Sequence, residues 1–336
     1  MRRRLLLATA LAGGLVAGAP AAALAEDGTP TVRCSITDPR LAELSGLVVV
    51  GEQMLAIADG GDQVAVYGLD GTCAVVDVRT APVDPYDPED LAVGPDGGVW
   101  IADTGDNNSD RGTVALHVLR PDGATALHRL TYPDGAHDAE ALLVAPDGTP
   151  YVVTKEVLGS SGVYRPSGPL ADGGTVPMER VATVNVTLTG TPGGPVGRAG
   201  QLMITGGAVA SDGSAVALRT YTDAYVWPLT GSDVVGALGG EPTRVALPES
   251  PQGEAVSFTS DSRALAVASE GLPSAVTVVP LPAGPPAPAT ASAAADPLPG
   301  FDELVRSDRP LITAALIAAG VATLVVWLGS RLFRRS

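Results

Sequence analysis

The sequence is poor in basic residues, and this shortage excludes a class of partners. Among 336 residues there is one lysine, Lys155, and the 21 basic residues are outnumbered by 37 acidic ones, for a net charge of −16. A surface this acidic repels nucleic acid and anionic lipid headgroups, and it favours cations such as Ca²⁺. A single lysine among many arginines and alanines is typical of a GC-rich genome such as that of an actinobacterium.

Cysteine is also scarce, with Cys34 and Cys73 alone in the chain. Two isolated cysteines cannot build a zinc site, but in an oxidising compartment they predict one disulfide, with two free thiols as the alternative. The chain has no G-x-S-x-G motif, and neither cysteine lies in a basic setting. Nucleophilic catalysis therefore has little support.

The N-terminus has the three parts of a secretory signal. A basic start at residues 2–4 precedes an apolar run, Leu5 to Val16, that is too short to span a bilayer comfortably. Ala23 and Ala25 then form the small-x-small pattern that signal peptidase accepts. We expect residues 1–25 to be a signal peptide cleaved before Glu26, and the alternative is an uncleaved anchor.

The C-terminus predicts a membrane anchor. Residues 311–330 form an uncharged, mostly apolar run, enough to cross about 30 Å of hydrocarbon as a helix. Arginines cluster after the run, so the positive-inside rule puts residues 331–336 in the cytoplasm. The alternatives are a buried core helix and a cell-wall sorting signal, but the latter needs LPxTG, from which Leu298 to Phe301 departs. We predict a single-pass cell-membrane protein with its transmembrane helix at 310–330 and its body outside.

Between these ends lie a folded body and a spacer. Residues 26–309 hold 15 basic and 37 acidic residues, a balance of −22. Residues 281–309 begin with a stretch rich in proline and alanine, a composition typical of an extended, semi-stiff spacer. The predicted extracytoplasmic domain is therefore residues 26–280.

This body contains an internal repeat instead of long helical periodicity. Five segments start alike: ELSGLVV, PEDLAV, AEALLV, GGAVAS and GEAVSF. Their aligned apolar residues are 44, 51, 67 and 47 residues apart, and they are Leu47, Leu91, Leu142, Val209 and Val256. Such a period indicates one repeated unit of supersecondary structure.

Each segment predicts the first of three or four short strands. A turn such as GPDGG, APDGT, ASDGS or TSDS follows it in four repeats, and Asp-Gly between apolar runs is a strong hairpin signal. Second and third runs follow in every repeat, and a fourth in four of them. Four strands per period predict an all-β fold, a β-propeller of five four-stranded blades. The 67-residue interval leaves room for a sixth blade, and a β-sandwich is the alternative.

The fifth repeat lacks its own fourth strand. We expect residues 31–37 at the N-terminus to supply it and so to close the ring. Cys34 would then lie on the closing strand and Cys73 on the outer strand of the first blade. A disulfide between them would lock the ring where it closes.

Propeller geometry predicts that two sets of loops meet at the mouth of the central channel. The loops that enter the first strands carry Glu43, Glu89, Asp90, Glu140 and Glu254. The loops that leave the second strands carry Asp59, Asp103, Lys155, Arg219 and Glu270. Converging carboxylates raise one another's pKa unless a cation lies between them, and Ca²⁺ accepts such flexible oxygen ligands.

We therefore predict a calcium site at this mouth. Its expected ligands are Asp59, Glu89, Asp90, Asp103, Glu140 and Glu254. The alternatives are a ring of ion pairs that includes Lys155 and Arg219, or a solvated acidic mouth.

Two further motifs could add chemistry on the same face. Asp106-x-Asn108-x-Asp110 resembles the start of a calcium loop, but it lacks that loop's later glycine and glutamate, and the alternative is a turn-rich loop. His137 precedes Asp138 and Glu140, and it could act as a general base beside a metal. A loop histidine without a role is the alternative.

The stretch ELSGLVVVGEQMLAIADG, followed by DPEDLAV, resembles the opening of SdiA-regulated and esterase-like phytase propellers, and more distantly NHL-repeat and lactonase propellers. The most specific stretch is PEDLAVGPDGGVWIADTGDN, and the resemblance covers most of residues 41–280. It implies a calcium-associated site around the axis, with Glu89, Glu140 and Glu254 at matching acidic positions. Some relatives hydrolyse phosphate esters or lactones. Phytate is a polyanion, however, and this mouth would hold it only through bridging calcium.

Two functions from different classes fit these features. The first is a binding or sensing module whose acidic mouth meets an extracellular ligand or protein of unknown identity. The second is a calcium-dependent, esterase- or lactonase-like hydrolase of a small ester, lactone or phosphoester, in which the metal would polarise the substrate and activate water. The lack of an obvious base or nucleophile favours the first.

Overall fold

In four of the five blades an aspartate turn sets where the first strand ends. In the computed structural model, which describes residues 28–282, Asp96 and Asp147 each accept a hydrogen bond of 3.0 Å from the backbone N–H two residues later. The residues between, Gly97 and Gly148, have φ angles of 78° and 86°. Glycine adopts this region without steric cost. Ser262 takes the equivalent place in the fifth repeat with a φ of 56°. The predicted hairpin turns are thus confirmed.

The strands between these turns form five antiparallel four-stranded sheets, whose strands are named in order from the axis outward. Blade 1 is β2 (Leu44–Val50), β3 (Gln53–Ala58), β4 (Val64–Leu69) and β5 (Val75–Ala81). Blade 2 is β6 (Pro88–Val93), β7 (Val99–Asp103), β8 (Val114–Leu119) and β9 (Thr125–Thr131). Blade 3 is β10 (Ala139–Val144), β11 (Pro150–Thr154), β12 (Ser160–Pro166) and β13 (Thr175–Asn185). Blade 4 is β14 (Ile204–Val209), β15 (Ala215–Thr220), β16 (Asp223–Pro228) and β17 (Thr243–Ala246). Blade 5 is β18 (Gly253–Phe258), β19 (Ala264–Ser269), β20 (Ser274–Pro280) and β1 (Thr31–Ile36).

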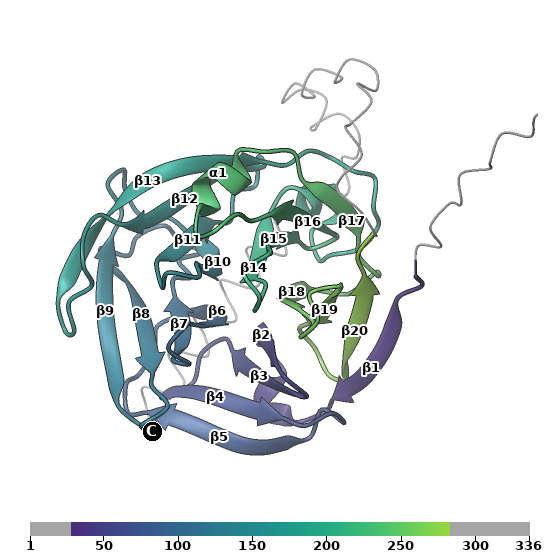
Figure 1. Ribbon diagram of the computed structural model, residues 1–336, viewed down its shortest axis with the longest axis horizontal. Coiled ribbons are helices and arrows are strands. Elements are labelled where there is room, and N and C mark those ends of the chain that lie inside the picture. The colour runs from purple at the N-terminus through teal and green to yellow at the C-terminus, as the bar shows by residue number, and fades with distance from the viewer. Residues whose placement is uncertain (1–27, 283–336) are drawn as a thin grey trace, which may run out of the picture.

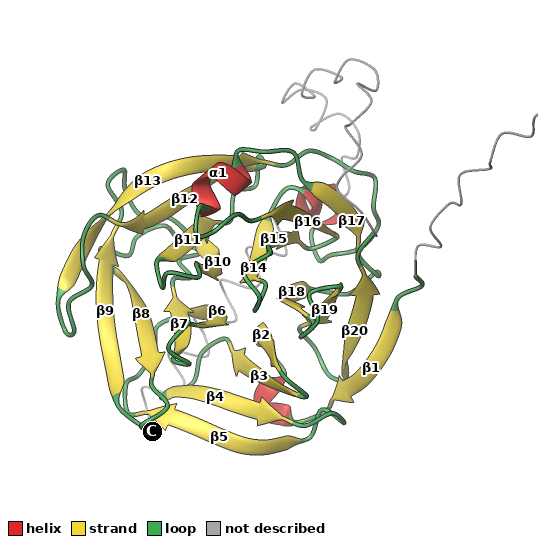
Figure 2. Cartoon of the chain, in the orientation of Figure 1, coloured by secondary structure: helices red, strands yellow, loops and turns green. Residues whose placement is uncertain are grey.

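These five sheets surround one axis, with β2, β6, β10, β14 and β18 nearest to it (Figure 1). The described residues contain no sixth blade. The long interval is filled by the 11-residue strand β13 and by a connection over residues 186–203 that includes the short 3₁₀ helix η2 (Gly197–Gln201). Strand β13 also pairs in parallel with β9, which joins the outer edges of blades 2 and 3. Figure 2 shows how little helix the ring contains.

The ring closes as the sequence predicts. Strand β1 pairs antiparallel with β20, so the N-terminal strand is the outermost strand of blade 5. The predicted disulfide joins Cys34 to Cys73, whose Cα atoms are 5.7 Å apart. One detail differs from the prediction: Cys73 lies in the turn between β4 and β5, not on the outer strand. Its φ of 68° places it in a tight turn, from which it reaches the edge of blade 5.

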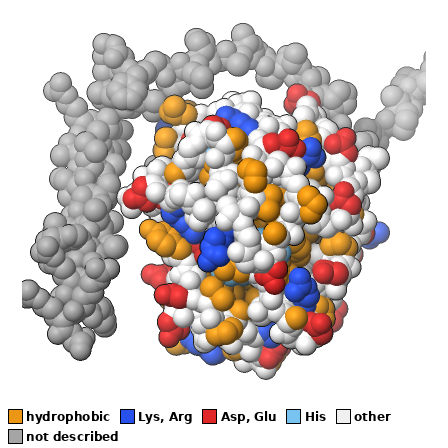
Figure 3. Space-filling model, turned by 90° about the vertical axis from the view of Figure 1, so that its left-hand side faces the viewer, with side chains coloured by type: hydrophobic (Ala, Val, Ile, Leu, Met, Phe, Trp, Pro, Cys, Tyr) orange, Lys and Arg blue, Asp and Glu red, His pale blue; other side chains and the backbone are white. Residues whose placement is uncertain are grey.

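Five apolar clusters hold the blades together, one between each pair of neighbours. Ile57 and Ile101, for example, belong to the cluster between blades 1 and 2. Leu142 and Leu116 belong to the cluster between blades 2 and 3. On the flank shown in Figure 3, acidic and basic side chains are interspersed with apolar ones.

A β-bulge recurs in the innermost strand of every blade. The register between first and second strands shifts across Ser45, Glu89, Glu140, Thr205 and the Glu254–Ala255 pair. A bulge inserts one unpaired residue and re-aims its side chain. In blades 2, 3 and 5 the bulged residue is glutamate, so three carboxylates come from equivalent places around the axis.

Within residues 28–282 no helix has the length and apolar character needed to cross a bilayer. The one α-helix there, α1 (Val234–Leu238), has five residues. The predicted signal peptide, most of the spacer, the transmembrane helix and the basic tail lie outside the described residues.

Candidate metal centre

A repeated backbone hydrogen bond brings the two predicted sets of loops together at the mouth. In each of four blades, a residue just after the second strand donates its backbone N–H. The acceptor is the backbone carbonyl of the residue that stands two positions before the bulged residue of the first strand. The four pairs are Asp59 with Glu43 (2.8 Å), Gly105 with Asp87 (3.1 Å), Lys155 with Asp138 (2.9 Å) and Glu270 with Gln252 (2.8 Å). These residues therefore surround the mouth in blades 1, 2, 3 and 5.

The tightest group of carboxylates is Glu89, Asp138 and Glu140. One oxygen from each lies within 4.8 Å of the others, so a single ion could contact all three. Glu89 and Glu140 are 7% and 3% exposed, and Asp138 is half-buried. Among the described residues, Oε2 of Glu140 is buried without a hydrogen-bond partner. A buried carboxylate oxygen without a donor is costly, and a metal ion would satisfy it.

Lys155 is the cation closest to this triad. Its ammonium forms an ion pair with Oε1 of Glu140, and its side chain is 10% exposed. The Nζ atom also lies 5.4 Å from the centre of the Tyr221 ring, within range of a cation–π interaction. The predicted ion pair at the mouth is thus present, but it engages only one oxygen of Glu140.

Burial and mutual repulsion raise the pKa of most mouth carboxylates. Burial raises the pKa of Glu89 and Glu140 well above the usual range, and neighbouring carboxylates add to the effect. The pKa of Asp87 rises to about 8 through burial and a hydrogen bond to Asp59. The pKa of Glu270 rises to about 7, chiefly through burial. A bound cation would favour the ionised forms.

Glu43, Asp59, Glu254 and Glu270 lie on the side of the mouth formed by blades 1 and 5. Glu254 is buried on the bulge of β18, and burial raises its pKa. The charges of Glu43, Asp59 and Glu254 all act on Glu270. The structure thus brings these four predicted residues into one electrostatic group, next to the triad rather than inside it.

Asp90 has a structural role in place of the predicted ligand role. Its carboxylate accepts hydrogen bonds of 2.8, 2.8 and 3.0 Å from the backbone N–H groups of Leu91, Leu142 and Gly207. These donors belong to blades 2, 3 and 4, so one carboxylate ties three blades together. Burial raises the pKa of Asp90, and the three N–H groups act in the opposite direction.

Asp103 also turns away from the axis. Its carboxylate forms an ion pair of 2.9 Å with Arg111 and lies 3.2 Å from Nε2 of His117. Gly105 makes the same backbone hydrogen bond in blade 2 that Lys155 makes in blade 3. Gly105 is the second residue after its strand, whereas Lys155 is the first, so blade 2 has one extra residue at this point. Asp103, predicted as a ligand, is thus engaged by Arg111 and His117 and is not among the three carboxylates that one ion could contact.

The calcium-loop motif is a turn-rich loop. Both carboxylate oxygens of Asp106 accept backbone N–H groups, from Asp110 at 3.0 Å and from Arg111 at 2.8 Å. Such a side chain satisfies its own loop and offers no free pair of oxygens.

Arg219 does not form the predicted ion pair. Its guanidinium is fully buried and donates to backbone carbonyls, including those of Ala255 and Ala268 at 2.8 and 3.2 Å. Burial lowers the pKa of Arg219 to about 10. It therefore fastens blade 4 to blade 5, and it acts on Glu254 through its charge without a direct ion pair.

His137 belongs to a separate cluster at the outer side of blade 3. Its Nε2 atom lies 3.1 Å from Asp134 and 3.2 Å from the hydroxyl of Tyr164, and Nδ1 lies 3.7 Å from Glu156. Both ring nitrogens thus face partners outside the triad. The structure gives no support to His137 as a base beside a metal.

The site includes three residues that the sequence pattern did not assign. Asp87 and Asp138 each stand two residues before a bulged glutamate, so an Asp-x-Glu pattern recurs in blades 2 and 3. That recurrence is a signal by which both could have been found. Tyr221, which follows β15, carries no such signal, since its place beside Lys155 depends on how blades 3 and 4 pack.

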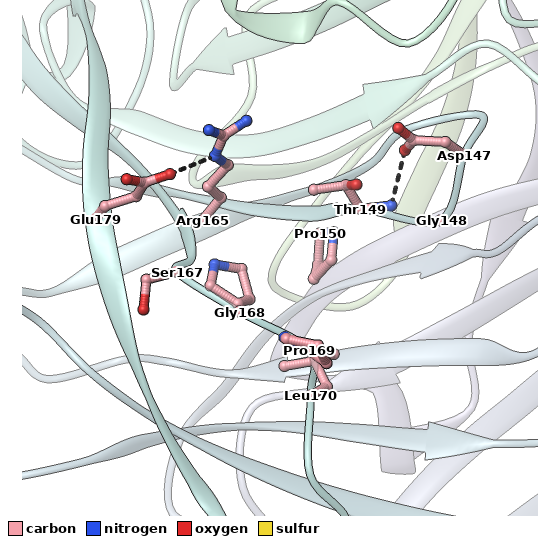
Figure 4. Close-up of a pocket in the computed structure, with 11 residues that line it drawn as sticks. Asp147, Gly148, Thr149, Pro150, Arg165, Ser167, Gly168, Pro169, Leu170 and Glu179 are labelled. Atoms are coloured by element: carbon pink, nitrogen blue, oxygen red, sulfur yellow. Dashed lines mark hydrogen bonds and ion pairs between the residues drawn. The ribbon is translucent and has the colours of Figure 1, made fainter.

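A hollow of about 450 Å³ lies on the opposite face, away from the mouth. It lies between the β10–β11 turn at Asp147 to Pro150 and the residues that follow β12, as Figure 4 shows. Its charged lining includes an exposed ion pair of 2.8 Å between Arg165 and Glu179. Surface ion pairs of this kind contribute little to stability. Among the described residues that line the hollow, we identify no candidate catalytic or metal-binding group.

Comparison with known proteins does not assign a family. No family model matches the chain, and no curated protein matches it. Similar solved structures include a gluconolactonase from Xanthomonas campestris, which is 20% identical with a TM-score of 0.42 over 72% of this chain and 73% of that chain. A streptogramin B lyase is 11% identical with a TM-score of 0.37 over 70% and 64% of the two chains. The PQQ-bound aldose sugar dehydrogenase from Streptomyces coelicolor is 11% identical with a TM-score of 0.39 over 75% and 98%.

Likeness at this level says nothing about activity. The propeller itself rests on the strand pairing of this chain. The resemblance to the SdiA-regulated and esterase-like phytase propellers stays a prediction, and function has to be argued from the mouth.

Proposed function

We propose that the mouth of this ring binds a divalent cation, Ca²⁺, and that the propeller is a binding module that presents the ion to an extracellular ligand or protein. One observation carries the proposal. Glu140 has a buried oxygen without a partner among the described residues, and it lies in a group of three carboxylates that one ion could contact. A buried, repelling group of acids is stable only when protonated or when neutralised by a cation.

The chemistry of the donors fits a hard cation. Glu89, Asp138 and Glu140 offer carboxylate oxygens, and Ca²⁺ prefers oxygen ligands in a flexible arrangement. The ion would lie against blades 2 and 3, with blades 1 and 5 adding negative charge. Extracellular calcium modules have dissociation constants of about 10⁻⁴–10⁻³ M, and we expect this range for the mouth.

Calcium titration of the purified ectodomain, residues 26–280, tests the proposal. At a free Ca²⁺ concentration of about 100 times Kd, binding should stabilise the fold by about 2.7 kcal/mol, which raises the melting temperature by about 5–11 °C. Glu140→Gln should remove the shift. Glu52→Gln makes the same change at an exposed turn between β2 and β3 and should keep it. If the wild-type melting temperature does not respond to Ca²⁺, the proposal fails.

A second candidate function is a calcium-dependent hydrolase of a small ester, lactone or phosphoester, and Asp87 is the observation that favours it. Its carboxyl is partly buried, forms a hydrogen bond with Asp59 and lies close to Glu89, so it could exchange a proton with a substrate held at the cation. A bound cation would polarise the carbonyl or phosphoryl group of the substrate. A panel of esters, lactones and phosphoesters, run with Ca²⁺ and with Asp87→Asn as control, separates the two functions. Calcium binding without turnover of any substrate leaves the binding module.

We also propose that the propeller stands outside the cell, held by the anchor that residues 310–330 predict. The composition of the two ends and the disulfide between Cys34 and Cys73 support this placement, since disulfides persist in oxidising compartments. Protease treatment of intact cells that express the full chain should degrade the propeller and spare the C-terminal tail. Full protection of the propeller would contradict the placement.

A further inference from the structure

Within residues 28–282, Lys155 is the one cation that forms an ion pair with a residue of the triad. It is the only lysine in the chain, and it follows β11 directly. Its backbone N–H donates to the carbonyl of Asp138 at 2.9 Å, and its ammonium pairs with Glu140. Two of the three triad residues therefore contact this lysine, one through the backbone and one through the side chain.

The two oxygens of Glu140 have different surroundings. Oε1 pairs with Lys155, whereas Oε2 is buried and has no hydrogen-bond partner within residues 28–282. An ion bound through Oε2 would leave the lysine in place. The lysine side chain is 10% exposed and packs toward Tyr221, so it has little freedom to turn away.

The charge that a bound ion meets depends on Lys155 and on the carboxylates around it. Glu89, Asp138 and Glu140 carry −3 when ionised, and Glu254 and Asp87 add negative charge beside them. Lys155 contributes a positive charge in direct contact with Glu140. Because the repulsion between the ammonium and a bound ion scales with the ion's charge, Lys155 disfavours trivalent ions more than divalent ones.

We propose that Lys155 is a specificity-determining residue, whose positive charge beside Glu140 lowers the preference of the mouth for a trivalent over a divalent cation. The inference rests on the proposed function, since it requires a cation at Glu140. It goes beyond that function by naming the residue that selects the ion and the direction of the selection.

The test compares two ions in two variants. Tb³⁺ and Ca²⁺ have similar oxygen preferences and different charges, and Tyr221 lies close enough to sensitise Tb³⁺ luminescence. Dissociation constants for Tb³⁺ come from luminescence titration, and those for Ca²⁺ from competition. In Lys155→Met both ions should bind more tightly, and the preference for Tb³⁺ over Ca²⁺ should increase on the order of tenfold, because the lost repulsion is larger for the higher charge.

Two controls separate charge from structural damage. Lys155→Arg keeps the charge and should keep the ratio of the two affinities. Arg263→Met removes one positive charge from the exposed turn between β18 and β19, on the opposite face, and should also keep it. A damaged fold would weaken both ions by a similar factor, so it would not raise the ratio. If Lys155→Met does not fold, Lys155→Gln removes the same charge with a polar side chain.

The two proposals fail in different ways. If wild-type protein binds neither Ca²⁺ nor Tb³⁺, or if Glu140→Gln does not abolish the binding, the proposed cation site is wrong. If wild-type protein binds both ions and the ratio is unchanged or lower in Lys155→Met and Lys155→Gln, the cation site stands and the selectivity role of Lys155 is overturned.

Discussion

The metal-free protein should lose stability as the pH rises from about 5 to about 8.5. Asp87 and Glu270 have folded-state pKa values of about 8 and about 7, above the values of about 4 to 4.5 that these groups have in an unfolded chain. The folded protein therefore binds more protons than the unfolded protein across this window. The free energy of unfolding must then fall as the pH rises through the folded-state pKa values.

The size of the effect follows from the shifts. One pKa unit corresponds to about 1.4 kcal/mol, so full ionisation of Glu270 would lower the free energy of unfolding by about 3 kcal/mol. Its side chain is partly exposed, and solvent screening reduces this to about 1–2 kcal/mol. Asp87 should add a similar amount, and Glu89 and Glu140 act in the same direction. A total of about 3 kcal/mol lowers the melting temperature by about 6–12 °C in a domain of this size.

Differential scanning calorimetry of the chelator-stripped ectodomain at several pH values measures this loss. Glu270→Gln should flatten the pH dependence, whereas Glu52→Gln, in an exposed turn, should leave it unchanged. Saturating Ca²⁺ should restore most of the stability at pH 8.5, where the carboxylates are ionised. A melting temperature that stays level or rises with pH in the metal-free protein would show that burial and mutual repulsion do not raise the pKa values of the mouth carboxylates as the structure indicates.

Three other changes have definite expected outcomes. Asp90→Ala leaves three backbone N–H groups of three blades without an acceptor, and chemical denaturation should show a loss of about 3–5 kcal/mol. Cys34→Ser, Cys73→Ser and the double variant all remove the disulfide, which links residues with a sequence separation of 39. In each of the three variants the free energy of unfolding should fall by the same amount, about 4 kcal/mol from chain entropy. Gly105→Ala would place a methyl group against the carboxylate of Glu89 and should weaken Ca²⁺ binding in titration calorimetry, while circular dichroism of the fold stays unchanged.

The ring itself could be predicted because its signals are local. In four of the five blades the first hairpin has an Asp-Gly or Asp-Ser turn with apolar runs beside it, and these signals predict the strands without reference to distant residues. Five copies then leave one strand missing, and β1 is the free strand that completes blade 5. The pairing of Cys34 with Cys73 follows from that closure, since it brings the two cysteines to neighbouring blades.

The direction of each side chain at the mouth could not be predicted in the same way. Adjacent strand residues point to opposite faces, and a bulge of one residue reverses that assignment locally. Glu89 and Asp90 are neighbours in sequence, yet one carboxylate joins the triad and the other binds three backbone amides. A single extra residue before Gly105 turns Asp103 toward Arg111.

The sequence by itself predicted a β-propeller that its N-terminal strand closes, with an acidic mouth, because repeated turns and alternating apolar residues act over short distances. It left a sixth blade and two free thiols open, and the structure shows five blades and the disulfide. The tertiary structure alone decided which acids form the triad, that Arg219 serves the backbone, and that Lys155 engages one oxygen of Glu140. Those choices depend on bulges and on contacts between blades about 50 residues apart in the chain. Their physical origin is packing around the axis, where five strands meet and each added carboxylate changes the charge that the others experience.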